Sequence, residues 1–570
     1  METAEPRRAP LDPWRVGSLI VGALVDLGLL YALIRLRWDS RWIGPPKAGV
    51  TGLEHIPAEW WRWGTLSDAL LSGPDAGNWA ANVEAALAGR TLDLYRMPVY
   101  TYLTAWMTRL FDDVVFAGHM VNHAASALVP VLAYVFGRAT SGRAPAFAAA
   151  ALTALTPALL NSAGLFGVDP SLQLAVMLLV ATGFWALSGP WWVVPIAGVA
   201  AGICAGAHYL GLLFPFVIGP LLLTRDGRWW SRGLAVVVFF GIGAGVWRLL
   251  FLEYPPLAWG DVAHVYAEGV IGSSGKAQAQ HGQGLSHAVA LVLAQAGGAW
   301  PMAVQRGLSP LAVGAAPWGL LVGAFWLGVI GPWLRPREGR LGWDWRPALT
   351  LAGLLAPLAA LEAARAPERY AFYSIPLVYL CVARGLATPF GAIDTLIQRR
   401  LPRWPRGLLA WAPCLWLLSA LLAPLQAQRP GPPPPEEPLQ DLQIGTAIRE
   451  EFTPGDHIVS NNQTLHFYSG RKRCLLQPCA NLGADTESAC ARTLLAGCSG
   501  RGDLPYVIEE RPQYGFANKP DELMDTMVTT HFERVCRSPG QQRSVSLYKV
   551  DRATLQRLAE QAAPSPAATP

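Results

Sequence analysis

Apolar runs separated by short polar loops fill the chain from Val16 to Leu425. A helix that spans a membrane needs about 20 mostly apolar residues, and in lipid an open, non-helical backbone would lack hydrogen-bond partners. The pattern therefore predicts an α-helical multi-pass membrane protein with about eleven spans. The predicted spans are 16–36, 114–136, 144–163, 171–187, 191–207, 209–223, 233–252, 310–334, 347–364, 371–387 and 408–425, and the run 288–304 is expected to be interfacial or re-entrant.

Composition agrees with this assignment. Hydrophobic residues make up 52% of the chain and charged residues 15%. With a mean hydropathy of +0.27, the chain is too apolar for an ordinary soluble protein of this length. The net charge of +5 is explained by arginines in the loops, so it gives no reason to invoke nucleic acid as a partner.

The arginines fall on alternate loops, and this distribution predicts the orientation of the helices. Short loops rich in Lys and Arg mark the cytoplasmic side of a membrane. We therefore predict a cytoplasmic N-terminus and place both the loop 37–113 and the C-terminal domain outside, and a bacterial inner (plasma) membrane fits best. The loop arginines are Arg7, Arg8, Arg138, Arg143, Arg225, Arg228, Arg232, Arg335, Arg337, Arg340, Arg399, Arg400, Arg403 and Arg406.

The composition changes after Leu425, where a proline-rich linker, 429–438, follows the last apolar run. Residues 1–428 are therefore predicted to form the transmembrane module, 439–555 an extracytoplasmic α/β domain, and 556–570 a disordered tail. Within this C-terminal domain, helical patterns cover 439–452, 487–496 and 520–535, and strand patterns cover 456–462, 506–510 and 544–550.

Five of the eight cysteines lie in the C-terminal domain, at Cys474, Cys479, Cys490, Cys498 and Cys536. An oxidising compartment favours disulfides, so we expect two bridges and one free thiol. A zinc site is the alternative interpretation, but the gaps differ from the close CxxC spacing of structural zinc sites.

The loop 37–113 is long enough to carry chemistry, and it contains two amphipathic stretches. The first begins near Asp75 and places Trp79, Val83, Ala86 and Leu87 on one face, which is typical of a helix resting on a membrane surface. Asp75 then lies at the leading end of this helix. The alternative role for Asp75 is a simple N-cap, because aspartate after Gly73 and Pro74 suits that position.

Several short motifs occur along the chain in an order that bears on its function. Asp75 opens the surface helix, Arg96-Met97-Pro98 leads the second one, Asp169-Pro170 follows the third span, and 368–376 reads ERYAFYSIP ahead of a late span. In this order and sidedness the chain resembles the GT-C glycosyltransferases, in particular the protein O-mannosyltransferase and lipid A aminoarabinose transferase superfamily. The resemblance covers most of the chain. It implies transfer of a sugar from a polyprenyl-phosphate-linked donor to an extracytoplasmic acceptor, with inversion. We expect no cofactor, and because the sequence near Asp75 and Asp169 has no dense acidic cluster, we predict no metal.

The resemblance and residue chemistry together suggest roles for individual side chains. Asp75 is the candidate base for the acceptor hydroxyl, with Asp169 assisting, and arginines suit the negative charge of a leaving phosphate. Asp169 capping the span at Pro170, and Arg365 and Arg369 anchoring a helix end, are the alternatives. The candidate phosphate ligands are Arg96, Arg365 and Arg369, and the candidate pocket residues are Asn78, Trp79, Tyr100, Tyr370 and Lys276.

Three polar residues lie within predicted spans. A carboxylate halfway along a span is costly, so Asp26 is expected to pair with another helix, with Arg248, His208 or His123 as possible partners. His119 and His123 lie four residues apart, a spacing that metal ligands also use, but without an intervening Glu we expect packing or a hydrogen bond between helices.

Two other classes of function remain open. A multi-pass transporter or flippase would also carry buried Asp and His residues. Two features oppose this reading: the chain shows no internal repeat, and transport would not require the outer domain. A non-catalytic protein of envelope assembly would use the outer domain as its binding module. Neither the sugar nor the kind of acceptor, whether lipid, glycan or protein, follows from the sequence.

Overall fold

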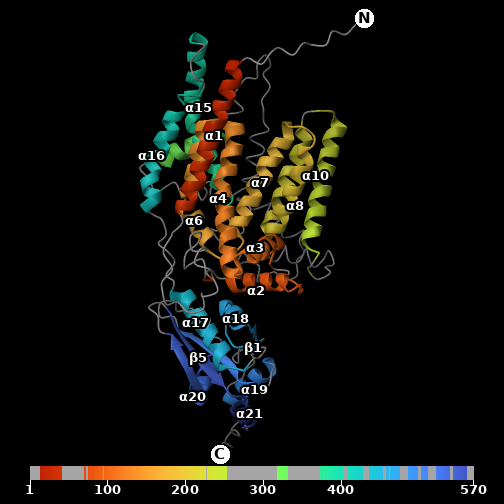
Figure 1. Cartoon of the computed structure of the whole chain (residues 1–570), viewed down its shortest axis with the longest axis vertical. Coiled ribbons are helices and arrows are strands. Elements are labelled where there is room, and N and C mark those ends of the chain that lie inside the picture. The colour runs from red at the N-terminus through yellow and green to blue at the C-terminus, as the bar shows by residue number, and fades with distance from the viewer. Residues whose placement is uncertain are drawn as a thin grey trace, which may run out of the picture.

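The structure is a computed structural model, in which the chain divides into a helical bundle and a smaller α/β domain at one end of it (Figure 1). It describes residues 13–40, 70–71, 75–93, 96–225, 227–252, 254, 308, 318–330, 373, 375–401, 407–427, 436–453, 457–460, 462–474, 486–498, 502–510, 522–538 and 543–561.

The described helices of the bundle follow the predicted apolar runs. Four of them are long and apolar enough to cross a membrane, and a bent pair makes a fifth. The four are α4 (Val114–Ser141), α7 (Asp169–Ser188), α10 (Trp229–Leu250) and α15 (Ile375–Arg400). The other helices of the bundle are α1 (Pro13–Ser40), α5 (Arg143–Leu155), α6 (Pro157–Gly164), α8 (Val193–Ala207), η3 (Tyr209–Leu212), α9 (Leu213–Leu221), η4 (Leu222–Thr224), α13 (Trp318–Ile330) and α16 (Trp411–Ala427).

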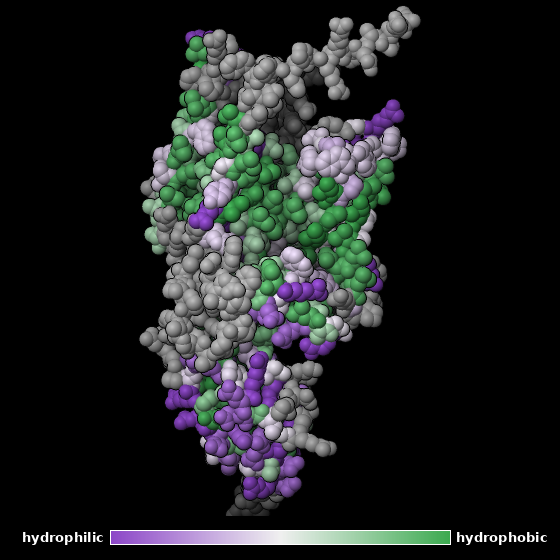
Figure 2. Space-filling view, in the orientation of Figure 1, coloured by the Kyte–Doolittle hydropathy of each residue, from purple (hydrophilic) through white to green (hydrophobic). Residues whose placement is uncertain are grey.

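The helical bundle and the C-terminal domain differ in the polarity of their surfaces. Hydrophobic surface covers the helical bundle, whereas hydrophilic surface covers the C-terminal domain (Figure 2). Large apolar side chains such as Val237, Tyr31 and Trp106 are about two-thirds exposed, which suits contact with lipid and not with water. The described structure thus supports a membrane protein, while the count of eleven spans stays a prediction because the predicted span 347–364 and the run 288–304 lie outside the described residues.

The predicted span 144–163 is broken. Thr156 has an extended backbone, and α5 and α6 meet there at 57° because Pro157 lacks the N–H that would continue the helix. The buried Arg37 side chain bridges the break, donating hydrogen bonds to the carbonyls of Ala154 and Leu159 at 3.0 and 2.6 Å. The break is therefore held by an arginine from α1 and does not loosen the bundle.

Asp26 pairs with arginines near the end of the bundle that lies away from the C-terminal domain. Its carboxylate accepts hydrogen bonds from Tyr134 at 2.6 Å and from Arg143 at 2.9 and 3.1 Å, and the Arg138 side chain lies 3.6 Å away. The expectation of a partner on another helix is confirmed, but the named candidates Arg248, His208 and His123 are wrong. Asp26 is therefore engaged in holding α1 to α4 and α5.

Two short helices, α2 (Ala76–Leu87) and α3 (Pro98–Phe111), lie across the end of the bundle that faces the C-terminal domain (Figure 1). The described arginine-rich turns, between α4 and α5 and after α15, lie at the opposite end. The described part of loop 37–113 and the C-terminal domain therefore lie at the same end of the bundle, while their side of the membrane stays a prediction. Which end faces the cytoplasm still rests on the charge rule.

The C-terminal domain contains helices and two small sheets. Strands β1 (His457–Ile458) and β2 (Lys472–Arg473) pair in parallel, and β5 (Ser544–Val550) lies between β3 (Leu504–Glu510) and β4 (Glu533–Ser538) in an antiparallel sheet. The helices are α17 (Glu436–Glu451), α18 (Gln463–Ser469), α19 (Glu487–Gly497), α20 (Glu522–His531) and α21 (Arg552–Glu560).

Three boundaries differ from the sequence expectation. The predicted helix 520–535 ends at His531, and its last residues belong to β4, which pairs with β5 at the edge of the described sheet. Helix α17 begins within the predicted linker, at Glu436. Helix α21 extends past residue 555, because Leu555 and Leu558 are buried in the domain core, so the predicted tail starts too early. Residues 562–570 lie outside the described part.

The cysteines of this domain form disulfides. Cys474 and Cys498 are bonded to each other, with their Cα atoms 5.0 Å apart, and Cys490 is also disulfide-bonded. Cys536 is a free thiol. Cys479 lies outside the described residues. Cys474, Cys490 and Cys498 are thus used in bridges, which removes ligands that the alternative zinc site would need.

Candidate functional site

Asp75 occupies the N-cap position of α2, but its side chain makes no capping hydrogen bond. Its Oδ1 atom instead accepts a hydrogen bond from Arg96 Nη2 at 3.1 Å, forming an ion pair. The Asp75 side chain is 40% exposed and that of Arg96 is 17% exposed. The carboxylate is therefore oriented by a cation while it remains accessible to solvent, which is the arrangement that a general base needs.

Arg96 is held by both its side chain and its backbone. The guanidinium carbon lies 5.5 Å from the centre of the Trp79 ring, a cation–π contact. The Arg96 carbonyl accepts hydrogen bonds from the Tyr254 hydroxyl at 2.6 Å and from Asn82 Nδ2 at 3.4 Å. Within the described part of the chain, the buried Arg96 Nε has no hydrogen-bond partner. Arg96 therefore retains a donor for a substrate group such as a phosphate oxygen.

Asn82 fixes the turn between α2 and α3. Its Oδ1 accepts from the Asp93 backbone N–H at 2.7 Å, and its Nδ2 donates to Thr101 Oγ1 at 3.2 Å. Asn82 is only 3% exposed. This one side chain ties the helix that begins at Asp75 to the helix that follows Arg96, so it sets the distance between the two charged groups.

Aromatic side chains form the floor beneath α2. The Trp79 ring meets Tyr100 edge-on with centroids 5.4 Å apart, Tyr100 meets Phe166 at 5.6 Å, and Phe166 meets His119 at 5.6 Å. The contact with α4 is close, because a Cβ at Gly118 would lie 2.2 Å from the Phe166 ring. The floor is therefore rigid, and it carries the Asp75–Arg96 pair on a packed support.

The predicted surface role of α2 needs correction. Trp79 is 5% exposed and Val83 is fully buried, so this face of the helix packs on protein and not on lipid. Leu87, at the far end of the helix, is 40% exposed. Trp79 and Tyr100 therefore support the site from below, and burial raises the pKa of Tyr100, which keeps its hydroxyl protonated.

The remaining predicted site residues are placed to different degrees. Asn78 is half-buried on α2, one turn beyond Asp75. Asp169 is the first residue of α7, and the N-cap residue Val168 beside it packs in the same cluster as Trp79. The structure thus brings Asp75, Arg96, Trp79 and Tyr100 together. Arg365, Arg369, Tyr370 and Lys276 lie outside the described residues.

Sequence reasoning missed Asn82 and Tyr254 as parts of the site. Asn82 lies three residues after Trp79, so it shares the buried face of α2, and a polar residue on such a face is a signal for a specific hydrogen bond. Tyr254 has no comparable signal, because it is 158 residues away from Arg96 along the chain.

The histidines of α4 bind side chains or backbone of other segments, as expected. His119 Nε2 lies 3.0 Å from the Leu70 carbonyl, and the His123 ring meets Trp38 edge-on at 6.3 Å. Among the described residues, no three His, Cys, Asp or Glu side chains gather as a metal site would require.

Comparison with known proteins identifies the fold. No family model matches the sequence, and no curated protein matches it significantly. The apo oligosaccharyltransferase of Archaeoglobus fulgidus is similar, with a TM-score of 0.56 and 14% identity over 85% of this chain and 69% of that chain. ArnT of Cupriavidus metallidurans bound to undecaprenyl phosphate is similar with a TM-score of 0.51 and 15% identity, over 92% of this chain and 97% of that chain.

A second A. fulgidus structure, the oligosaccharyltransferase AglB in complex with an inhibitory peptide and dolichol-phosphate, gives a TM-score of 0.52 and 15% identity, over 84% of this chain and 69% of that chain. These proteins are GT-C glycosyltransferases. The chain therefore has the GT-C fold, and the resemblance predicted from its motifs is confirmed at the level of the fold. At such low identity the likeness establishes the fold alone, and activity must be argued from the site.

Proposed function

We propose that this protein is a membrane glycosyltransferase that transfers a sugar from a polyprenyl-phosphate-linked donor to an extracytoplasmic acceptor, with inversion. The observation that carries the proposal is the Asp75–Arg96 pair. Asp75 begins a helix without capping it, stays 40% exposed, and is oriented by Arg96 at 3.1 Å. The pair lies at the end of a GT-C-like bundle that faces the C-terminal domain.

The residue chemistry fits an inverting displacement. The acceptor hydroxyl oxygen bonds to the anomeric carbon while the bond from that carbon to the phosphate oxygen breaks. Asp75 takes the hydroxyl proton, and the bonding electrons leave with the lipid phosphate. Arg96 Nε, buried and without a partner in the described part of the chain, is a suitable donor to that phosphate. Asp169, Arg365 and Arg369 remain proposed participants.

The neighbours support a lipid phosphate as the donor carrier. One was solved with undecaprenyl phosphate and another with dolichol-phosphate and an inhibitory peptide. These ligands share a phosphate on a polyprenyl chain, and a membrane-embedded bundle with a cation at its end suits such a molecule. We propose the same class of carrier for this protein, in an inner (plasma) membrane with the C-terminal domain outside.

The test is sugar transfer by purified protein in lipid vesicles, with radiolabelled polyprenyl-phosphate sugars and a cell-envelope extract as acceptor. Asp75→Asn should lower kcat by about 10² to 10⁴-fold, the usual contribution of a general base. Its thermal stability should stay close to that of the wild type, because exposed ion pairs contribute about 0–1 kcal/mol. Fractionation of the label then identifies the acceptor class.

Asp112→Asn is the matched control. Asp112 is an exposed carboxylate that ends α3 with a φ of 56°, a left-handed backbone that asparagine tolerates. This variant should transfer sugar at the wild-type rate. Full activity in Asp75→Asn would remove the proposed base, and no incorporation from any donor would refute the glycosyltransferase and favour a flippase or an assembly protein.

The transporter alternative loses one of its supports. It drew on a carboxylate inside the membrane, but Asp26 is bound by Tyr134 and Arg143 and lies beside Arg138. A carboxylate held by several partners is a structural group and not a free proton carrier.

A further inference from the structure

The peptide group between Leu70 and Leu71, shortly before Asp75, is hydrogen-bonded from two sides. Leu70 and Leu71 are 1% and 2% exposed. From the bundle, His119 Nε2 donates a hydrogen bond to the Leu70 carbonyl at 3.0 Å, which requires the Nε2-protonated tautomer. From the C-terminal domain, the Tyr468 hydroxyl accepts the Leu71 N–H at 2.8 Å. The single peptide group that joins Leu70 to Leu71 is thus held by both modules.

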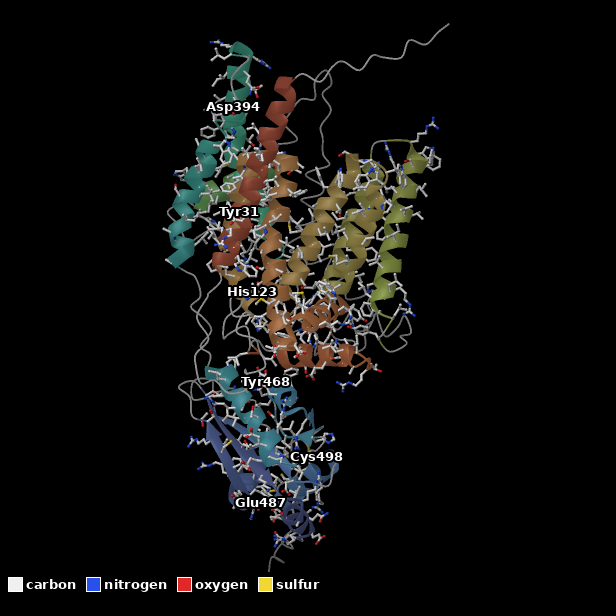
Figure 3. All side chains as sticks on the ribbon, viewed as in Figure 1. Tyr31, His123, Asp394, Tyr468, Glu487 and Cys498 are labelled. Carbon is white, nitrogen blue, oxygen red and sulfur yellow. A yellow bond between two sulfur atoms is a disulfide. The ribbon has the colours of Figure 1, made fainter. Side chains whose placement is uncertain are left out.

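Tyr468 is built into the C-terminal domain so that it faces the bundle. It lies on α18 at the edge of the domain next to α2 (Figure 3), and it is 6% exposed. Its ring packs in one cluster with Leu71, Ala76 and Trp79. Helix α17 supports it from behind, since a Cβ on Gly445 would lie 2.4 Å from the Tyr468 Cβ. Burial raises the pKa of Tyr468, so its hydroxyl stays neutral.

Other residues of the C-terminal domain also pack against α2. Leu442 and Phe467 lie against the same cluster as Ala76 and Trp79 of that helix. The domain also affects α2 by its charge: desolvation raises the pKa of Glu84, and the positive charges of Arg449 and Arg90 offset part of that rise. The domain thus packs on the helix that begins with the candidate base.

We propose that Tyr468 is a positioning residue for Asp75, so that docking of the C-terminal domain completes the active site. This inference rests on the proposed function. Asp75 lies four positions after Leu71, a span of at most about 14 Å of extended chain, so fixing the 70–71 peptide restricts where the carboxylate can lie. A displacement of about 1 Å in a catalytic group can cost a hundredfold in rate, which gives this restriction a catalytic value.

The first arm of the test measures the hydrogen bond between the Leu71 amide and Tyr468 and does not depend on activity. Hydrogen exchange of the Leu71 amide is followed in the full-length protein in lipid nanodiscs, for wild type and Tyr468→Phe. Phenylalanine keeps the ring in its cluster and removes only the hydroxyl acceptor. The amide should be protected in the wild type and exchange at least about tenfold faster in the variant, because its N–H loses its partner. Equal protection in both proteins would overturn the proposal.

The second arm measures sugar transfer. Tyr468→Phe should lower kcat by roughly tenfold, the rate equivalent of one net hydrogen bond, while the KM for the lipid-linked donor stays unchanged. In an Asp75→Asn background, Tyr468→Phe should cause no further loss, because it acts through that carboxylate. A wild-type kcat in Tyr468→Phe, or an additive loss with Asp75→Asn, would overturn the positioning role.

Tyr506→Phe is the matched control. Tyr506 is a fully buried tyrosine of the same domain, and its hydroxyl donates to Asp525 Oδ1 at 2.9 Å, inside the domain and away from α2. This variant should keep kcat within about twofold of the wild type even where the domain melts earlier. A wild-type protein that transfers no sugar would refute the proposed function. The hydrogen-exchange result would still decide whether the C-terminal domain holds the 70–71 peptide through Tyr468.

Discussion

Two carboxylate–arginine pairs among the described residues, Asp441–Arg543 and Asp75–Arg96, are built differently. In the C-terminal domain, Arg543 is 1% exposed and contacts Asp441 at 2.5 Å and Glu509 at 3.0 Å, and Asn462 also donates to Asp441 at 2.9 Å. At the end of the bundle, Arg96 makes a single 3.1 Å contact with Asp75, whose side chain is 40% exposed.

This contrast separates a structural pair from a candidate catalytic one. The Asp441–Arg543 pair is surrounded by protein partners, so its energy goes into joining α17 to the sheet. The two pairs differ at the carboxylate. The Asp75 side chain is 40% exposed and has Arg96 as its described partner, whereas the Asp441 side chain is 8% exposed and accepts hydrogen bonds from both Arg543 and Asn462. Asp75 can therefore still bind a substrate group, although the residue types are the same in both places.

The largest effect should come from breaking the structural pair. Arg543→Met leaves Asp441 and Glu509 without their cation, and removing one partner of a buried ion pair typically costs about 3–5 kcal/mol. The unfolding free energy of the C-terminal domain should fall by that amount near neutral pH, measured by denaturant unfolding of the full chain in nanodiscs. Activity then falls only because the domain no longer docks.

A compensated variant sharpens this result. Arg543→Met combined with Asp441→Leu and Glu509→Gln removes the buried charges together, and apolar replacement of a buried pair is often neutral. Most of the lost stability should return. A single Arg543→Met variant as stable as the wild type would show that the pair is not a structural one, and the contrast with Asp75–Arg96 would lose its basis.

Hydropathy predicted much of the bundle, because a spanning helix makes its backbone hydrogen bonds within itself and needs a long apolar run that is visible in the sequence. Helices α4, α7, α10 and α15 overlap the predicted spans. The break at Pro157 could have been predicted from the sequence, since proline interrupts a helix. The hydrogen bonds from Arg37 that stabilise the break come from another helix, so local sequence could not predict them. The predicted helix 520–535 includes the first three residues of β4, because the pairing of this strand with β5 is a tertiary effect.

The site was predictable only in part. Asp75 and Arg96 are 21 residues apart and were named together from the order of motifs, but their direct contact depends on the turn that Asn82 fixes. Tyr468 contacts Leu71 across 397 residues, a separation at which local patterns carry no information. Contacts of this kind come from the docking of whole modules, so they need the structure.

A smaller effect, on rate and not on stability, is expected at Arg96. Arg96→Lys keeps a positive charge but loses the planar group that stacks on Trp79 and the Nε donor. We expect kcat/KM for sugar transfer to fall roughly 10- to 100-fold, about 1.4 to 2.7 kcal/mol in the transition state, with little change in melting temperature.

Arg90→Lys serves as the control for Arg96→Lys, because Arg90 is exposed just beyond α2. It should leave both rate and stability unchanged. If Arg96→Lys lowered stability as much as rate, the exposed pair would be structural after all, and the distinction from Asp441–Arg543 would fail.

The smallest effect is a pH dependence of stability that the buried Asp441–Arg543 pair should show. Burial outweighs the Arg543 charge and raises the pKa of Asp441 from 3.8 to about 6. The folded domain therefore binds this proton more tightly than the unfolded chain, so the contribution to stability is complete below about pH 4 and is lost as pH rises through about 6. One proton gives a slope of at most about 1.4 kcal/mol per pH unit.

The measurement is denaturant unfolding of the C-terminal domain between about pH 4 and 8, in wild type and Asp441→Asn. The wild type should lose stability relative to the variant as pH rises, since asparagine cannot ionise. Asp503→Asn, which removes an exposed carboxylate paired with Lys549, should run parallel to the wild type. A constant difference between wild type and Asp441→Asn would mean that Arg543 keeps Asp441 ionised throughout, which would make the buried pair a stabilising one at every pH and widen its contrast with the open pair at Asp75.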